Sequence, residues 1–132
     1  MVLQFELVAP ERLILSEHVE MVVVPGCEGD FGVLFNHAPM ISAMRPGVLS
    51  VYRSGGIVER IFVTSGFAEV TGSALTVLAE KASVVDSLNR VELEQQLSRA
   101  RVALETADTQ QTRAEAERQI VVTEAMLAAI RT

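Results

Sequence analysis

Two alternating runs and the turn between them decide the fold: Val48-Leu49-Ser50-Val51-Tyr52, then Ser54-Gly55-Gly56, then Ile57-Val58-Glu59-Arg60-Ile61-Phe62-Val63. Successive side chains of a strand point to opposite faces, so the last run should place Ile57, Glu59, Ile61 and Val63 on one side. Val58, Arg60 and Phe62 should lie on the other side. A glycine pair between two such runs is typical of a hairpin turn. The segment therefore predicts two antiparallel strands.

The same pattern continues in both directions along the chain. Leu3, Phe5 and Leu7 alternate with polar residues, and a β-branched block over residues 21–24 stops at Pro25-Gly26. Two further runs, at residues 67–70 and 74–79, flank a Thr-Gly-Ser turn. Several short strands with turn signals and no helical pattern between them are typical of sandwiches and barrels. We predict an antiparallel β-sandwich or flattened barrel over residues 1–86.

A helical pattern replaces the strand pattern after Asp86. Asn89 is a good N-cap with Glu92 three places on, close to a capping box. Apolar residues then recur at helical spacing in two groups, with a lapse at residues 106–109 between them. They are Leu93, Leu97, Ala100 and Leu104, then Ala116, Ile120, Thr123, Leu127 and Ile130. We predict a two-helix antiparallel hairpin over residues 87–132.

The end of the second predicted helix is apolar over more than one stripe. Residues 121–130 include Val121, Val122, Met126 and Leu127 among several alanines. Such a helix usually meets more than one neighbour, although a frayed alanine-rich end without a partner gives the same composition. The sequence leaves both interpretations open.

Charge and composition exclude several function classes. The net charge is −6, with ten acidic against five basic residues up to Asp86 and seven against six afterwards. Nucleic-acid binding requires a basic face, so we expect no nucleic-acid partner. The single cysteine, Cys27, excludes an internal disulfide. No apolar run approaches the ~18 residues of a membrane span, and the N-terminus does not resemble a signal peptide.

No motif for catalysis or metal binding is found. His18, His37 and Cys27 lack metal-ligand spacing, and no phosphate-binding loop ends in the one lysine, Lys81. His37 has two interpretations, a hydrogen-bonded loop anchor or the acid/base of a stand-alone enzyme. We expect no catalytic residue, no metal and no cofactor, and we keep the enzyme that uses His37 as an alternative.

One segment, Gly29-Asp30-Phe31-Gly32-Val33-Leu34-Phe35-Asn36-His37-Ala38-Pro39, resembles the signature of the ε subunit of F-type, proton-translocating ATP synthases. Three further segments match that family in the same order. They are Arg45-Pro46-Gly47, Ile61-Phe62-Val63-Thr64-Ser65-Gly66-Phe67-Ala68-Glu69-Val70 and Thr76-Val77-Leu78-Ala79-Glu80. The resemblance covers nearly the whole chain.

The resemblance implies a non-catalytic subunit of the central stalk. Its sandwich is expected to dock the γ subunit onto the ring of c subunits and to couple proton flow to ATP synthesis. The c-ring side is expected at Glu28, Gly29, Asp30 and Phe31, and the γ side at His37, Ala38, Pro39 and Met40. The chain should lie on the cytoplasmic face of the inner cell membrane, held there only by the complex. A mitochondrial or chloroplast counterpart is an open alternative.

The same resemblance implies two possible roles for the helices. In some relatives they extend into the α and β subunits and inhibit ATP hydrolysis, so residues 87–132 could meet those subunits here. Other relatives sense ATP through Asp, two residues, Arg and Ala. In this chain three residues separate Asp86 from Arg90, and Val91 replaces the alanine. An extra residue rotates a helical side chain by about 100°, so we expect weak or absent ATP binding at Asp86 and Arg90.

Overall fold

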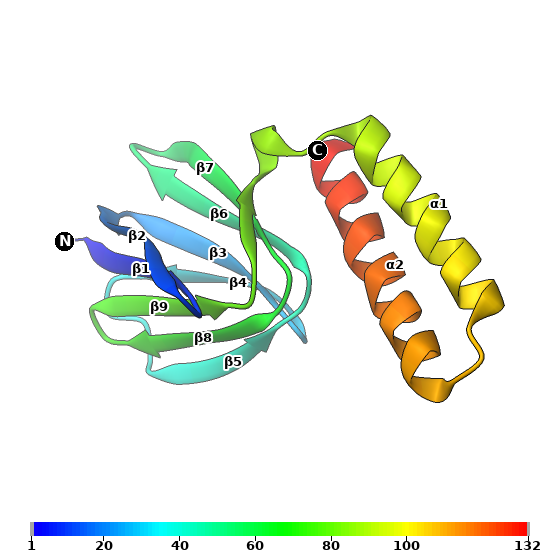
Figure 1. The fold of residues 1–132 in the computed structure, drawn as a ribbon. Helices are drawn as coiled ribbons and strands as arrows, with labels where there is room; N and C mark the ends of the chain where they lie inside the picture. Colours follow the sequence, from blue (N-terminus) through cyan, green and yellow to red (C-terminus); the bar gives the residue numbers. More distant parts are fainter. Residues whose placement is uncertain (1, 132) are drawn as a thin grey trace. The chain divides into compact units, whose positions relative to one another are not determined.

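The computed structural model describes residues 2–131 and divides the chain into two compact units between Val84 and Val85 (Figure 1). The first unit is built of strands and the second of two helices. The predicted class, a β-sandwich followed by a helical hairpin, is confirmed.

The strands of the first unit form one strongly bent sheet. In chain order they are β1 (Leu3–Ala9), β2 (Arg12–Val19), β3 (Met21–Gly26), β4 (Gly29–Leu34), β5 (Met40–Met44), β6 (Gly47–Arg53), β7 (Gly56–Val63), β8 (Gly66–Thr71), β9 (Ala74–Ala79) and β10 (Ala82–Val84). Their spatial order is β10-β7-β6-β3-β5-β8-β9-β1-β2, with β4 also paired to β3. β2, β4, β5 and β10 have no counterpart among the predicted strands.

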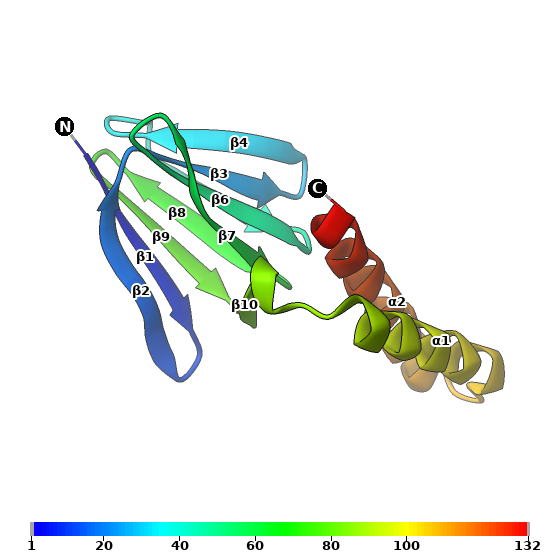
Figure 2. The same cartoon turned by 90° about the horizontal axis from the view of Figure 1, so that it is seen from above.

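The bend divides the sheet into two layers that face each other (Figures 1 and 2). One layer holds β4, β3, β6, β7 and β10, and the other holds β5, β8, β9, β1 and β2. At the bend, β3 and β5 are paired only through Gly26 and Met44. Such a bent sheet is a flattened, incompletely closed barrel, as the turn spacing predicted.

One strand pair departs from the antiparallel prediction. β1 runs parallel to β9, with Gln4 opposite Ala74 and Val8 opposite Leu78. Turn signals predict pairing between neighbours in sequence, whereas β1 and β9 are joined by no turn. The sheet is therefore mixed and not purely antiparallel.

The core lies between the two layers and follows the predicted alternation. Leu3, Phe5 and Leu7 of β1 are fully buried, as are Leu49 and Val51 of β6. Burying a side chain of this kind contributes about 1.5–3 kcal/mol relative to leaving it in water. The prediction for β7 was wrong at one position. A β-bulge places Glu59 opposite Val51 but Ile57 opposite Tyr52, so Ile57 does not share the inward side.

The second unit is a hairpin of α1 (Arg90–Thr106) and α2 (Gln110–Arg131), preceded by a short 3-10 turn over Val85–Ser87. The Asn89 cap is confirmed, because its side-chain oxygen accepts a hydrogen bond from the Glu92 amide at 3.1 Å. The helices pack through Leu93, Leu97 and Leu127. Of the helices within residues 2–131, neither is long and apolar enough to span a membrane.

Gly66 allows β8 and β9 to approach each other at the start of β8. Its φ is +142°, and a Cβ there would lie 1.8 Å from the Leu78 carbonyl oxygen. We expect Gly66→Ala to lower the free energy of unfolding by about 3 kcal/mol, because it combines a disfavoured φ with a backbone clash. Urea denaturation measures this change.

The matched control for this prediction is Gly72→Ala. Gly72 has no atom within 4 Å of its Cβ position and lies on the neighbouring turn. Its replacement should leave the urea midpoint nearly unchanged. Equal effects of the two substitutions would contradict the role given to Gly66.

Candidate partner-binding surfaces

The stretch expected to face the c ring forms the tip of the β3–β4 hairpin. Cys27 and Glu28 make the turn, and β4 begins at Gly29. Asp30 and Phe31 are therefore strand residues, opposite Pro25 and Val24. The four residues are adjacent, as the sequence requires, but they form a strand end and not a free loop.

Arg45 holds this tip in place. Its Nη2 lies 2.6 Å from Asp30 Oδ1, and its Nη1 donates to the Gly26 carbonyl oxygen at 2.6 Å. The Arg45 backbone amide donates to the Pro25 carbonyl oxygen at 3.0 Å. A Cβ on Gly26 would lie 2.7 Å from the Gly29 carbonyl oxygen, so the two strands meet closely here. The tip is thus fixed by backbone contacts and one guanidinium.

The two carboxylates at the tip, those of Asp30 and Glu28, differ in how freely they can pair with a partner protein. The Asp30–Arg45 pair is exposed, so its net contribution to stability is at most about 1 kcal/mol. The Asp30 carboxylate is nevertheless already paired with the Arg45 guanidinium. The Glu28 carboxylate has no ion-pair partner within residues 2–131. An incoming partner meets one uncompensated carboxylate, that of Glu28, beside the exposed thiol of Cys27.

The residues expected on the γ side lie between β4 and β5. The Asn36 amide donates to the Gly72 carbonyl oxygen at 2.6 Å, and the His37 amide donates to the Leu34 carbonyl oxygen at 3.1 Å. His37 Nδ1 lies 2.7 Å from the Ala38 carbonyl oxygen, to which it donates. Ala38 and Pro39 are exposed and lead directly into β5, which begins at Met40.

Asp86 and Arg90, the doubtful nucleotide-binding pair, occupy different elements. Asp86 lies in the 3-10 turn and Arg90 is the first residue of α1, with the Asn89 cap between the two elements. No ion pair joins the two side chains in the part of the chain that the structure describes. Both are exposed.

An exposed apolar stripe, which the sequence analysis missed, crosses the outer face of the layer containing β5. Directly opposed residues of five successive strands form it, from β5 through β8, β9 and β1 to β2. They are Ala43, Phe67, Leu78, Val8 and Leu13, and we call them the outer apolar row. Phe67, Leu78 and Leu13 are each half exposed. The signal in the sequence was an apolar residue on the expected outward side of each strand.

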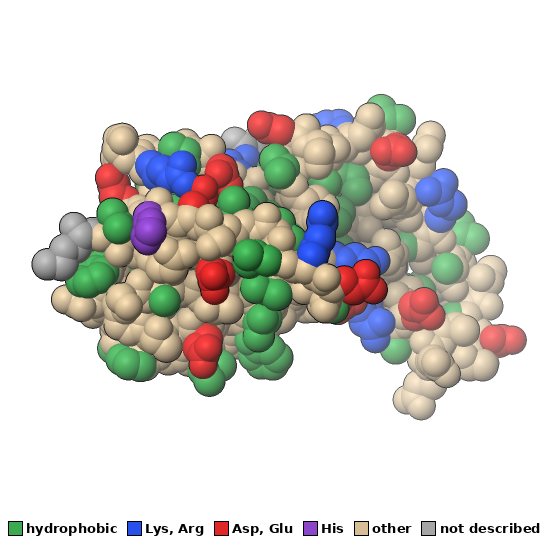
Figure 3. Space-filling model, turned by 60° about the vertical axis from the view of Figure 1, so that its left-hand side comes forward, with side chains coloured by type: hydrophobic (Ala, Val, Ile, Leu, Met, Phe, Trp, Pro, Cys, Tyr) green, Lys and Arg blue, Asp and Glu red, His purple; other side chains and the backbone are tan. Residues whose placement is uncertain are grey.

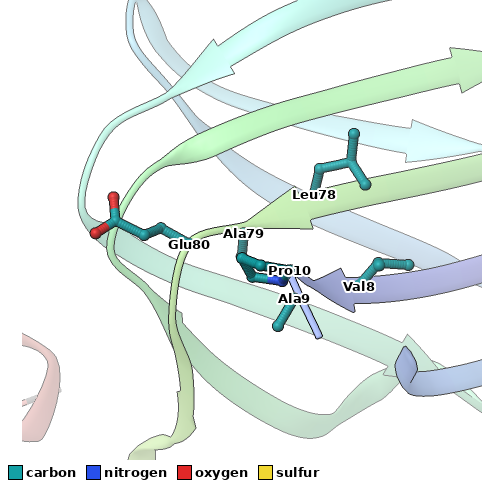
Figure 4. Close-up of a pocket in the computed structure, with 6 residues that line it drawn as sticks. All are labelled: Val8, Ala9, Pro10, Leu78, Ala79 and Glu80. Atoms are coloured by element: carbon teal, nitrogen blue, oxygen red, sulfur yellow. The ribbon is translucent and has the colours of Figure 1, made fainter. Parts of the chain in front are cut away.

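The surroundings of the outer apolar row are mixed in character. Ile41, 70% exposed, lies on the same outward side of β5, and Glu69 lies opposite it on β8. Figure 3 shows exposed hydrophobic side chains in groups, with single acidic groups between them. A shallow pocket of about 390 Å³ adjoins the row where β1 and β9 end, with Val8 and Leu78 on its wall (Figure 4). Isolated exposed apolar residues are common, but a continuous row is typical of a protein-binding surface.

Residues 2–131 contain no group of three or more His, Cys, Asp or Glu side chains placed to hold a metal ion. The two candidate partner-binding surfaces are the hairpin tip held by Arg45, which we call the strapped tip, and the outer apolar row.

Comparison with known proteins gives consistent matches. The family described as "ATP synthase, Delta/Epsilon chain, beta-sandwich domain" matches residues 2–85. The chain is 49% identical to an ATP synthase epsilon chain of Rhodospirillum rubrum, covering 96% of this chain and 94% of the relative. It is 47% identical to the corresponding chain of Paramagnetospirillum magneticum, covering 97% and 96%.

Two solved structures share the fold. A chain from the mitochondrial ATP synthase of Euglena gracilis, in a structure of OSCP, F1 and the c-ring, superposes with a TM-score of 0.86 at 23% identity. That match covers 98% of this chain and 81% of the other. A chain from the central stalk and c-ring of the Tetrahymena thermophila enzyme gives a TM-score of 0.68 at 12% identity, covering 97% and 96%.

Proposed function

Because the chain belongs to the ATP synthase epsilon chain family, we propose that it is a non-catalytic rotor subunit that docks γ onto the c ring and couples proton flow to ATP synthesis. The observation that carries this proposal is the presence of two chemically different surfaces on one β-sandwich. The outer apolar row is expected to form a permanent apolar contact with a partner. The strapped tip, which Arg45 holds in a fixed position, is expected to form a polar contact that transmits torque.

The outer apolar row is the proposed γ-binding surface. Fully buried interface cores are rich in aromatic and aliphatic residues, and the centre of such a core contributes most of the binding energy. Phe67 lies between Ala43 and Leu78 in the row and is 54% exposed in the chain alone. The proposed γ side at His37, Ala38, Pro39 and Met40 continues into the same face, because these residues lead into β5.

The hairpin tip is the proposed c-ring contact. Its hydrogen bonds to Arg45 hold Gly26 and Asp30 in fixed positions, which a joint that transmits torque requires. The free carboxylate of Glu28 can meet a basic group of the ring, and such pairs set orientation more than affinity. In this arrangement the chain lies at the cytoplasmic face of the membrane without entering it.

The helical hairpin is the proposed regulatory part. Large apolar contacts between its helices are concentrated at Leu93, Leu97 and Leu127. Nearer the turn, Ala100, Ala103 and Ala116 line a shallow groove of about 320 Å³ between the helices. Because small alanines line the helix contact nearest the turn, that end should separate at lower cost than the end packed by Leu93, Leu97 and Leu127, which favours extension toward the α and β subunits.

The stand-alone enzyme using His37 remains the alternative from another function class. His37 Nδ1 already donates to the Ala38 carbonyl oxygen, which favours the anchoring role. Turnover of a substrate by the purified chain, abolished by His37→Ala, would establish the alternative.

The γ assignment is tested with Phe67→Asp. A charge within the outer apolar row should weaken binding to γ by about tenfold or more, because it would be buried without a partner. Val58→Asp is the matched control, since Val58 is 48% exposed on β7 in the opposite layer. Copurification of γ from assembled enzyme should be lost only with Phe67→Asp, and its survival there would refute the assignment.

The c-ring assignment can be tested with the native thiol. Cys27 is the only cysteine in the chain and is exposed at the tip. A photoreactive maleimide on Cys27 should cross-link to a c subunit in intact enzyme, detected by mass spectrometry. Cys27→Ser provides the control, and products with other subunits only would place the tip elsewhere.

Removal of residues 85–132 tests the regulatory role. We expect faster ATP hydrolysis by the assembled enzyme, because the proposed inhibitory segment is lost while the sandwich unit stays whole. The rate is measured at saturating ATP with equal amounts of assembled complex. An unchanged rate would make the hairpin a passive element.

A further inference from the structure

Three charged residues occupy inward-facing positions at one end of the sandwich. Glu17 lies opposite Phe5, and Glu59 lies opposite Val51. Phe5 and Val51 are fully buried, and directly opposed residues share a face of the sheet. Arg53 follows Val51 by two residues and lies on the same side of β6. We call Glu17, Arg53 and Glu59 the seam triad.

The seam triad joins the two layers where no strand pairing does. β2 is the last strand of one layer, and β10 and β7 end the other. β2 contacts β6 without pairing to it. A pocket of about 280 Å³ opens beside the triad, lined by Leu15 and Arg12 of β2, Glu59 and Ile61 of β7, and Ser83 of β10. The two layers are therefore joined at this end by contacts between side chains and not by strand pairing.

The contacts within the triad leave one acceptor and one donor unsatisfied, because Glu17 Oε1 and Arg53 Nε are both buried without a hydrogen-bond partner among residues 2–131. Arg53 Nη2 forms an ion pair with Glu17 Oε2, and the Glu17 side chain is only 19% exposed. Glu17 Oε1 is buried and has no donor among residues 2–131. A buried acceptor without a donor costs about 1–3 kcal/mol, so an arrangement that supplies a donor is favoured.

Glu59 can supply that donor if it carries a proton. Burial is the main cause that raises the pKa of Glu59, and the charge of Glu17 and a hydrogen bond with Glu17 raise it further. Arg53 acts in the opposite direction. Two carboxyl groups in contact share a proton because both cannot be charged at low cost.

We propose that Glu17 and Glu59 share one proton across the seam, and that this proton holds the two layers together. The Glu59 carboxyl donates to the Glu17 carboxylate, whose second oxygen accepts from Arg53. When the proton leaves, two carboxylates face one guanidinium, and their repulsion weakens the seam. The shared proton involves only residues of the sandwich unit. A test of it is therefore independent of the assignments of γ and the c ring.

The other polar groups around Glu17 and Glu59 cannot account for the same gain and loss of a proton. Arg12 of β2 and Arg53 of β6 are guanidinium groups, which remain charged over the whole range. Ser83 of β10 is uncharged. The proton uptake of the seam therefore belongs to the two carboxyl groups.

The pH dependence of stability follows from linkage. The folded state binds the proton more tightly than the unfolded chain, so the stabilisation is complete below the ordinary glutamate pKa. It is lost as pH rises through the raised pKa of Glu59. The urea midpoint of the full chain should fall over this window, and Glu59→Gln should remove that fall, since an amide donates to Glu17 without titrating.

Glu69→Gln is the matched control, because Glu69 is exposed on the outer face of β8. It should keep the wild-type fall in midpoint, and above the window Glu59→Gln should be more stable than the wild type. Carbon-13 NMR of the wild-type carboxyl groups provides a second measurement that needs no variant. Glu59 should titrate above the ordinary range of a glutamate; an ordinary titration of Glu59, or an unchanged pH dependence in Glu59→Gln, would overturn the proposal.

Discussion

Pairing between β1 and β9 connects the start of the chain to residues 74–79, and most of the sandwich depends on it. Through this pairing Leu3, Phe5 and Leu7 enter the core, where each is fully buried. The strand also carries β2 with it, because the two form a hairpin. Without β1 in place, the layer containing β5 would end at β9. Neither the outer apolar row nor the seam triad would then be complete. The contact is long-range in sequence, so forming it costs more chain entropy than forming a hairpin does.

β5 connects the two surfaces to which partners are assigned. Its outward side carries Ile41 and Ala43, which belong to the apolar face. Its last residue, Met44, pairs with Gly26 at the bend, and Arg45 follows immediately to hold the hairpin tip. A short strand thus links an apolar contact on one side to a polar contact at the end of the molecule. The tip is joined to β5 by the backbone pairing of Gly26 with Met44 and by the Arg45 guanidinium, which contacts Gly26 and Asp30.

Local patterns predicted much of this structure, and non-local contacts account for the rest. Alternation at residues 3–7 and 57–63, the glycine turns and the Asn89 cap are properties of neighbouring residues, and the structure follows them closely. β2 was missed because Leu13, Ile14 and Leu15 are consecutive apolar residues around a bulge, which obscures a period of two. The parallel pairing of β1 and the strap from Arg45 join residues far apart in sequence. The outer apolar row required knowledge of strand order, since its members come from five strands.

The inward charges at the seam also have a consequence for the edges of the sheet. β2 ends the strand order on one side, and no further strand among residues 2–131 covers its outer edge, so a strand of another molecule could add there. A strand added beside β2 would have to cover Glu17 and separate it from Arg53, leaving a charge buried without its partner. Charged side chains turned inward at an edge are a recognised protection against such association. The seam triad therefore also opposes the addition of a foreign strand at the β2 edge of the sheet.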